Sequence, residues 1–167
     1  MSQRVVLVTG PNGFLANEVC KQLVPDFKVI GLTRENTKCA TTVEASYDRV
    51  NILAESVPSV DIVMHLAACI PKPIDASFPE IDSTNVGLVD RLVATYPNAR
   101  HILASSVAVY GTPRSLPISL GCAAVDPTHY GVSKLKAESV VKMAKSHAII
   151  RFSSIIGVGM KPETFIP

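Results

Sequence analysis

Residues 4–16 of this chain are Arg4-Val-Val-Leu-Val8-Thr-Gly10-Pro-Asn-Gly13-Phe-Leu-Ala16. The apolar run Arg4–Val8 is typical of a short buried strand, and the pattern from Gly13 to Leu23 predicts a helix directly after it. Gly10 and Gly13 can adopt backbone angles closed to other residues, so a ligand can approach the main chain. The first amides of a helix favour negative charge. The order of strand, glycine turn and helix therefore predicts a site for the pyrophosphate of a dinucleotide.

The glycine turn has an unusual spacing, because its second glycine follows three residues after the first and a small residue follows three further on. Ala16 is this small residue, and it lets the helix and the strand pack closely. A glycine-rich turn without a cofactor is the alternative interpretation of the motif alone. The candidate cofactor-binding residues in the turn are Gly10, Asn12, Gly13, Phe14 and Leu15.

Apolar runs and helical patterns alternate along the rest of the chain, which is typical of a parallel sheet covered by helices. The predicted strands are Arg4–Val8, Lys28–Leu32, Asp61–Leu66, His101–Ala104 and Ala148–Phe152, with a weaker one near Thr42–Ala45. The predicted helices are Gly13–Leu23, Val50–Glu55, Pro79–Tyr96 and Thr128–Lys145. The sequence thus predicts an α/β fold with a doubly wound parallel sheet, the Rossmann fold.

Three polar side chains near the last predicted helix have the pattern of a proton-transfer site. Tyr130 and Lys134 are four residues apart, so they share a helix face. A free tyrosine ionises near pH ~10, and an ammonium one turn away favours the phenolate and lowers that pKa. Ser106 would donate to the substrate oxygen while Tyr130 takes its proton and a hydride leaves the same carbon. We predict that Ser106, Tyr130 and Lys134 are catalytic, although Y-x-x-x-K also occurs by chance in helices.

The end of the second predicted strand, Gly31-Leu-Thr33-Arg34, bears on the choice of nicotinamide cofactor. A carboxylate there binds the ribose hydroxyls of NAD, whereas an arginine accommodates the 2′-phosphate of NADP. Thr33 is not acidic and Arg34 carries a guanidinium, so the sequence slightly favours NADP over NAD. The alternative is that Arg34 is a solvated surface residue.

Five separated motifs resemble the extended branch of the short-chain dehydrogenase/reductase superfamily, the NAD-dependent epimerases and dehydratases. They are the T-G-P-N-G-F-L-A turn, Asp61–Ala68, Asn85 within S-T-N-V-G, Ser105–Gly111 and Tyr130–Lys134. Their order and separations match this family up to about Gly157. The resemblance implies hydride transfer at a hydroxyl or keto carbon by an oxidoreductase, epimerase or dehydratase, with a nucleotide sugar as the substrate.

The resemblance also implies further cofactor contacts. Ala67 and Ala68 match small residues that line the ribose and nicotinamide, although buried alanine is the alternative. Asn85 matches an asparagine that supports the active site, although an ordinary polar helix residue is the alternative, and Lys134 would also bond the nicotinamide ribose. His65 is expected to be a core histidine, or one that supports the site from behind, rather than a base, because it lies inside an apolar strand. The implied cofactor positions are Asp48, Leu66, Ala67, Ala68, Asn85, Ser105, Tyr130 and Lys134.

The resemblance weakens after Tyr110. Ser154 and Ile156 stand where the family has the asparagine and tyrosine of an R-x-x-N-V-Y-G-P run that holds the nucleotide sugar, which leaves the substrate open. The family pattern divides the chain into an NAD(P)-binding domain, residues 1–157, and residues 158–167, the start of a truncated or absent substrate lobe. A non-catalytic dinucleotide-binding module and an inactive fragment of a longer enzyme are the alternatives. Relatives often form homodimers through the two helices predicted at Pro79–Tyr96 and Thr128–Lys145.

Composition narrows the class of protein. Of the 167 residues, 47% are hydrophobic and 18% are charged, and the formal net charge of +2 is too small to indicate a nucleic acid or an anionic membrane as a partner. No apolar run approaches the ~18 residues that span a bilayer. The four cysteines lack C-x-x-C spacing, so we expect reduced thiols, no metal site and a cytoplasmic location.

Overall fold

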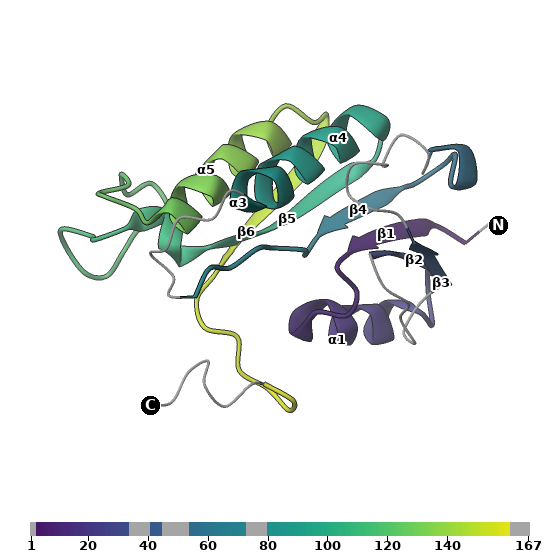
Figure 1. Cartoon of the computed structure of the whole chain (residues 1–167), viewed down its shortest axis with the longest axis horizontal. Helices are drawn as coiled ribbons and strands as arrows, with labels where there is room; N and C mark the ends of the chain where they lie inside the picture. Colours follow the sequence, from purple (N-terminus) through teal and green to yellow (C-terminus); the bar gives the residue numbers. More distant parts are fainter. Residues whose placement is uncertain (1–2, 34–40, 45–53, 73–79, 161–167) are drawn as a thin grey trace.

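The computed structural model describes residues 3–33, 41–44, 54–72 and 80–160. Its strands are β1 (Val5–Thr9), β2 (Lys28–Thr33), β3 (Thr41–Glu44), β4 (Ile62–His65), β5 (Arg100–Ser106) and β6 (Ser146–Phe152). Its helices are α1 (Phe14–Leu23), α3 (Glu80–Asp82), α4 (Leu88–Thr95) and α5 (His129–Val141), with the π-helical turn η2 (Ser83–Gly87) and the 3-10 turn η3 (Val107–Tyr110). Figure 1 shows α4 and α5 on one side of the sheet and α1 on the other.

The described strands form one sheet in the order β3-β2-β1-β4-β5-β6, and all of them pair in parallel. At the centre, Leu7 of β1 lies opposite Ile30 of β2 and Val63 of β4. The strand order reverses between β1 and β4, and ligands of doubly wound sheets bind beyond the carboxyl ends of the strands at this point. The predicted fold class is confirmed, and it places the candidate site at one edge of the sheet.

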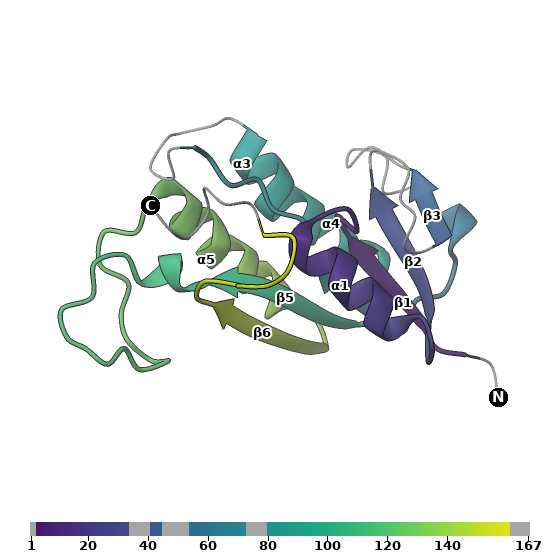
Figure 2. The same cartoon turned by 90° about the horizontal axis from the view of Figure 1, so that it is seen from below.

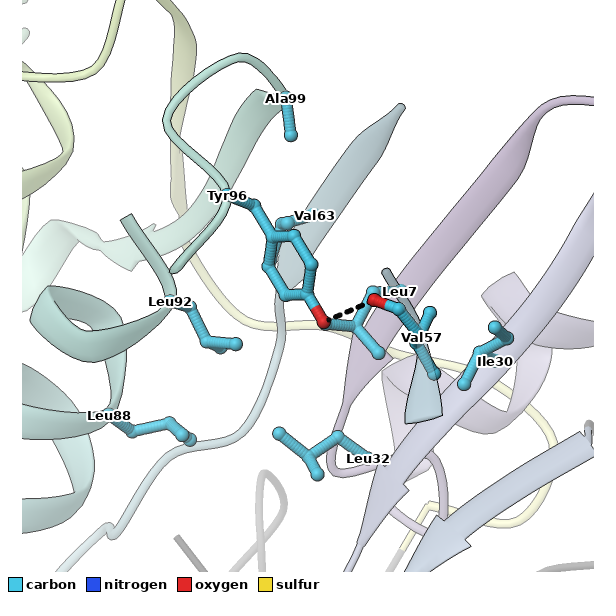
Figure 3. Packing of buried hydrophobic residues seen from close by; sticks show 9 residues of the cluster. All are labelled: Leu7, Ile30, Leu32, Val57, Val63, Leu88, Leu92, Tyr96 and Ala99. Carbon is cyan, nitrogen blue, oxygen red and sulfur yellow. Dashed lines mark hydrogen bonds between the residues drawn. The ribbon is translucent and has the colours of Figure 1, made fainter. Parts of the chain in front are cut away.

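Alternate residues of β1 pack into the cores on opposite faces of the sheet, as the period of two in a strand requires. Leu7 belongs to the core under α4, where the Tyr96 hydroxyl donates to the carbonyl oxygen of Val57 at 3.0 Å (Figure 3). The core under α1 contains the buried residues Val6, Val8, Ala16, Cys20 and Val29. Burial on both faces explains why β1 is a continuous apolar run in the sequence.

The helix predicted at Pro79–Tyr96 is interrupted in the structure. It consists of α3, the π-helical turn η2 and α4, and Asn85 lies in the π-helical turn. A π-helical turn holds one extra residue, and such turns are frequent at functional sites. Sequence periodicity does not reveal the interruption, because the apolar residues on either side keep a helical spacing.

The helix predicted at Thr128–Lys145 ends earlier, at Val141. The reason is that β6 already begins at Ser146, so the residues between must turn the chain. Met143 lies in this turn and is 71% exposed. The helix predicted at Val50–Glu55 falls largely outside the described residues.

Gly111 closes the turn after η3 with φ 62° and ψ −124°, a conformation that residues with a side chain rarely adopt. A Cβ atom there would overlap the carbonyl oxygen of Val125, whereas a Cβ at Gly121 would meet no described atom within 4 Å. We predict that Gly111→Ala lowers the free energy of unfolding by about 3 kcal/mol or more, and that Gly121→Ala changes it by less than about 0.5 kcal/mol. Urea unfolding measures both. Equal stability of the two variants would contradict a fixed turn at Gly111.

Candidate functional site

The glycine turn between β1 and α1 leads directly into a helix N-terminus. Gly10 has φ 65°, and a Cβ there would lie 3.1 Å from the Cα and Cβ of Ala67, so Gly10 packs directly on the chain after β4. The N-cap of α1 is Gly13, which has no side chain to cap the helix. The amides at a helix N-terminus bind anions such as a pyrophosphate, so the turn fits a dinucleotide. The predicted residues of this turn are Gly10, Asn12, Gly13, Phe14 and Leu15.

Thr9, the last residue of β1, joins this turn to the chain after β4. Its Oγ1 accepts hydrogen bonds from the backbone N–H groups of Leu66 at 3.0 Å and Ala67 at 2.9 Å. Thr9 is 1% exposed, so without this hydroxyl the N–H of Ala67 would lose a bond that is shielded from water, whereas the N–H of Leu66 would keep its 3.2 Å bond to the Met64 carbonyl. The bonds hold Leu66, Ala67 and Ala68, which the family resemblance assigns to the cofactor, beside Gly10. Sequence reasoning missed Thr9, although a hydroxyl directly before the first glycine was visible.

The chain after β6 returns to the start of α1, as Figure 2 shows. A Cβ at Gly157 would lie 3.2 Å from Cζ of Phe14, so the two residues are in contact. Ile156 beside them is 65% exposed. The run in which this sequence departs from its family therefore lies next to the glycine turn.

The structure brings Ser106, Tyr130 and Lys134 together at the carboxyl end of β5. The Lys134 Nζ atom lies 5.8 Å from the centroid of the Tyr130 ring and donates a hydrogen bond to the carbonyl oxygen of Ala104 at 2.9 Å. The Tyr130 hydroxyl interacts with the Ser106 side chain, whose Oγ also accepts from the N–H of Ala108 at 3.1 Å. Tyr130 and Lys134 are 7% and 3% exposed. The cluster is thus a largely buried alcohol, phenol and amine.

Burial acts on the pKa values of both ionisable groups in this cluster. It raises the pKa of Tyr130, while the interaction with Ser106 acts in the opposite direction. It lowers the pKa of Lys134 to about 8. The sequence predicted that Lys134 lowers the pKa of Tyr130, and in the structure this prediction is wrong. Burial of the phenol dominates, and the ammonium group bonds the Ala104 carbonyl.

Asn85 connects the chain after β4 to α5. Its Oδ1 accepts from the N–H of Cys69 at 2.7 Å, and its Nδ2 donates to the Cys69 carbonyl and to Ser133 Oγ, both at 3.0 Å. Ser133 Oγ donates in turn to the carbonyl oxygen of Tyr130 at 2.7 Å. Asn85 is 1% exposed, so these bonds are shielded from water. The sequence predicted a supporting role for Asn85, and these are the contacts through which it would act.

A buried ion-pair network, which sequence reasoning missed, lies beside the cluster. The Ser105 hydroxyl donates to Oε1 of Glu138 at 2.6 Å, and Arg151 binds both oxygens of that carboxylate at 2.9 and 2.7 Å. Nη1 of Arg151 also donates to the Tyr110 hydroxyl at 2.8 Å and to the Leu120 carbonyl at 3.1 Å. Because the Ser105 hydroxyl bonds Glu138, the predicted contact of Ser105 with the cofactor would be made by its main chain.

Other sequence-based expectations have different outcomes. Arg34 and Asp48, predicted to contact the adenosine part of the cofactor, lie outside the described residues. His65 is 1% exposed, so it is buried, as its place in an apolar strand predicts. Within the described ranges, no helix is long and apolar enough to cross a membrane.

The fold and the site together define a parallel α/β domain of the extended short-chain dehydrogenase/reductase type. The chain belongs to the NAD dependent epimerase/dehydratase family, whose model matches residues 6–167. It is 28% identical to a putative UDP-glucose 4-epimerase of Methanocaldococcus jannaschii, over 95% of this chain and 58% of that protein.

Solved structures extend this similarity. MoeE5 in complex with UDP-glucose and NAD is 28% identical with a TM-score of 0.84, over 96% of this chain and 57% of that one. A putative epimerase from Burkholderia cenocepacia has the same fold, with 22% identity and a TM-score of 0.81, over 97% of this chain and 58% of that one. The chain therefore spans little more than half the length of these relatives.

The pKa of Lys134 predicts a rise of stability with pH. An unfolded lysine keeps its ordinary pKa near 10.5, so between about pH 8 and that value the unfolded state binds more protons, and the free energy of unfolding rises. Lys134→Met removes the titrating group. From about pH 7.5 to about pH 9.5, urea unfolding should show the wild type gaining about 2 kcal/mol relative to Lys134→Met. A difference that does not change with pH would mean that folding leaves the pKa of Lys134 at its ordinary value.

Proposed function

We propose that this chain is the cofactor-binding and catalytic part of an NAD(P)-dependent epimerase, dehydratase or reductase that acts at a hydroxyl or keto carbon of a nucleotide sugar. The observation that carries the proposal is the cluster of Ser106, Tyr130 and Lys134 at the same edge of the sheet as the glycine turn and the N-terminus of α1. The family supports the class of reaction, and MoeE5 with bound UDP-glucose and NAD supports the substrate and the cofactor.

Three side chains divide the work on the substrate oxygen. Ser106 donates a hydrogen bond that orients this oxygen, and Tyr130 moves a proton at its phenolic oxygen. The raised pKa of Tyr130 keeps the phenol protonated, which suits donation to a keto oxygen. Proton uptake from an alcohol requires the phenolate, and the positive charge of Lys134, retained at neutral pH because its pKa is about 8, would favour that form against the burial that raises the pKa of Tyr130. Bound NAD or NADP supplies the hydride acceptor.

The cofactor is held by the main chain. The amides around Gly13 bind the pyrophosphate, and Thr9 keeps Ala67 and Ala68 in place for the ribose and nicotinamide. Arg34 favours NADP, whereas NAD is the cofactor in the MoeE5 structure. Titration with both nucleotides decides between them.

The assembly is also part of the proposal. Residues 1–157 form the NAD(P)-binding domain, and residues 158–167 are the start of a truncated or absent substrate lobe. The helical layer of α4 and α5 forms a homodimer interface in the cytoplasm.

A non-catalytic dinucleotide-binding module is the second candidate function, and the departures at Ser154 and Ile156 favour it.

Phe14 offers a test of the pyrophosphate site. It is the first residue of α1 and is 40% exposed, so an acid there stabilises the helix N-terminus but repels a bound pyrophosphate. We predict that Phe14→Asp binds NAD at least ~10-fold more weakly than Phe14→Asn, which has the same size without the charge, and that it is no less stable. Isothermal titration calorimetry with NAD and NADP measures the affinities. Equal affinities of the two variants would place the cofactor elsewhere.

Tyr130→Phe tests catalysis. The change keeps the ring beside Lys134 and removes the oxygen that moves the proton. NAD affinity should stay within about 3-fold, while hydride transfer, followed by NADH absorbance with UDP-glucose as the probe, falls at least ~100-fold. Tyr96→Phe is the control, since it loses a buried hydroxyl bond in the core under α4. NAD binding without hydride transfer that depends on Tyr130 would support the non-catalytic module.

A further inference from the structure

A buried pair of histidines connects the end of β4 to the residue that follows α4. The proposed chemistry uses neither histidine. His65 ends β4 and His101 lies in β5, with ring centroids 5.2 Å apart and an angle of 20° between the rings. His65 Nε2 lies 2.9 Å from His101 Nδ1, and His101 Nε2 lies 3.0 Å from the carbonyl oxygen of Tyr96. Both histidines are at most 1% exposed.

The position of each proton follows from this chain of bonds. A carbonyl oxygen can only accept, so His101 Nε2 must carry a proton and donate to Tyr96. Burial lowers the pKa of both rings, that of His65 to about 3, so both are neutral at physiological pH. A neutral His101 then has a lone pair at Nδ1, and His65 Nε2 must donate to it. The lone pair of His65 is therefore at Nδ1.

This Nδ1 atom is buried and has no hydrogen-bond partner within the part of the chain that the structure describes. A buried acceptor that lacks a donor is destabilising, so a donor is expected. Two titratable groups act on His65, namely His101 from β5 and Lys134 from α5. The ammonium of Lys134 has three N–H donors, and one of them bonds the carbonyl of Ala104. Ala104 is the neighbour of Leu103, which lies opposite His65 in the sheet.

We propose that one buried water molecule connects His65 Nδ1 to a second N–H donor of Lys134, which makes His65 a positioning residue for the ammonium. The histidine pair suits this task because it presents a fixed lone pair and adds no negative charge that would pull the ammonium away from Tyr130. Buried waters bond two to four polar groups, so one water can accept from the ammonium of Lys134 and donate to His65. The value of this arrangement for catalysis rests on the proposed function, but the arrangement itself does not.

Two substitutions separate the two nitrogens of His65. The amide of His65→Asn reaches the place of Nδ1, so it keeps an acceptor for the water and loses the bond to His101. The amide of His65→Gln reaches the place of Nε2, so it keeps the bond to His101 and loses the acceptor. We expect the pKa of Lys134, followed by NMR of its side chain, to fall by about one unit in His65→Gln and to change by less than about 0.3 units in His65→Asn. The same pKa of Lys134 in both variants would overturn the proposal.

The wild-type chain provides a measurement that does not depend on how the variants fold. Nitrogen-15 NMR of the histidine rings distinguishes protonated from unprotonated ring nitrogens. We expect both His65 and His101 to be neutral at physiological pH, each with its proton on Nε2. A proton on Nδ1 of His65, or a charge on either ring, would overturn the proposal. Neither measurement uses turnover or NAD, so a failure here is distinct from a failure of the proposed function, which Tyr130→Phe tests.

Discussion

A side chain at Gly10 would crowd the chain after β4, because a Cβ there would lie 3.1 Å from the Cα and Cβ of Ala67. The hydroxyl of Thr9 maintains this contact by accepting from two backbone amides of the chain after β4. Since β1 and β4 are the strands at which the sheet order reverses, the contact places the glycine turn and the chain after β4 at the same edge of the sheet. The site depends on this close approach, because a dinucleotide must contact both segments at once.

Two polar networks connect this edge of the sheet to α5, the proposed catalytic helix. On one side, Asn85 bonds Cys69 in the chain after β4 and reaches Tyr130 through Ser133. On the other side, the buried carboxylate of Glu138 links Ser105, and with it the end of β5, to β6. A fully bonded buried network has one favourable geometry, so α5 is held in register with the strand that carries the serines. The phenol therefore lies between two rigid supports.

Much of the fold and part of the site follow from local patterns. The apolar run Arg4–Val8 predicted β1 to within a residue, and the glycine turn predicted where α1 begins, because strand period and turn chemistry act over a few residues. The spacing of Tyr130 and Lys134 placed both on one helix face. Helix ends were less predictable, and Met143 is exposed because β6 follows so closely.

The sequence by itself determined the order of strands and helices, the glycine turn and the identity of the residues that form the cluster. The tertiary structure alone decided how these groups behave. Burial raises the pKa of Tyr130, contrary to what its spacing from Lys134 indicates, because the surroundings that exclude water come from distant parts of the chain. The partners of Glu138 and His65 lie on other strands and loops, so they too depend on packing. Spacing along a chain determines which residues can share a face, whereas desolvation and long-range hydrogen bonds arise only when the faces meet.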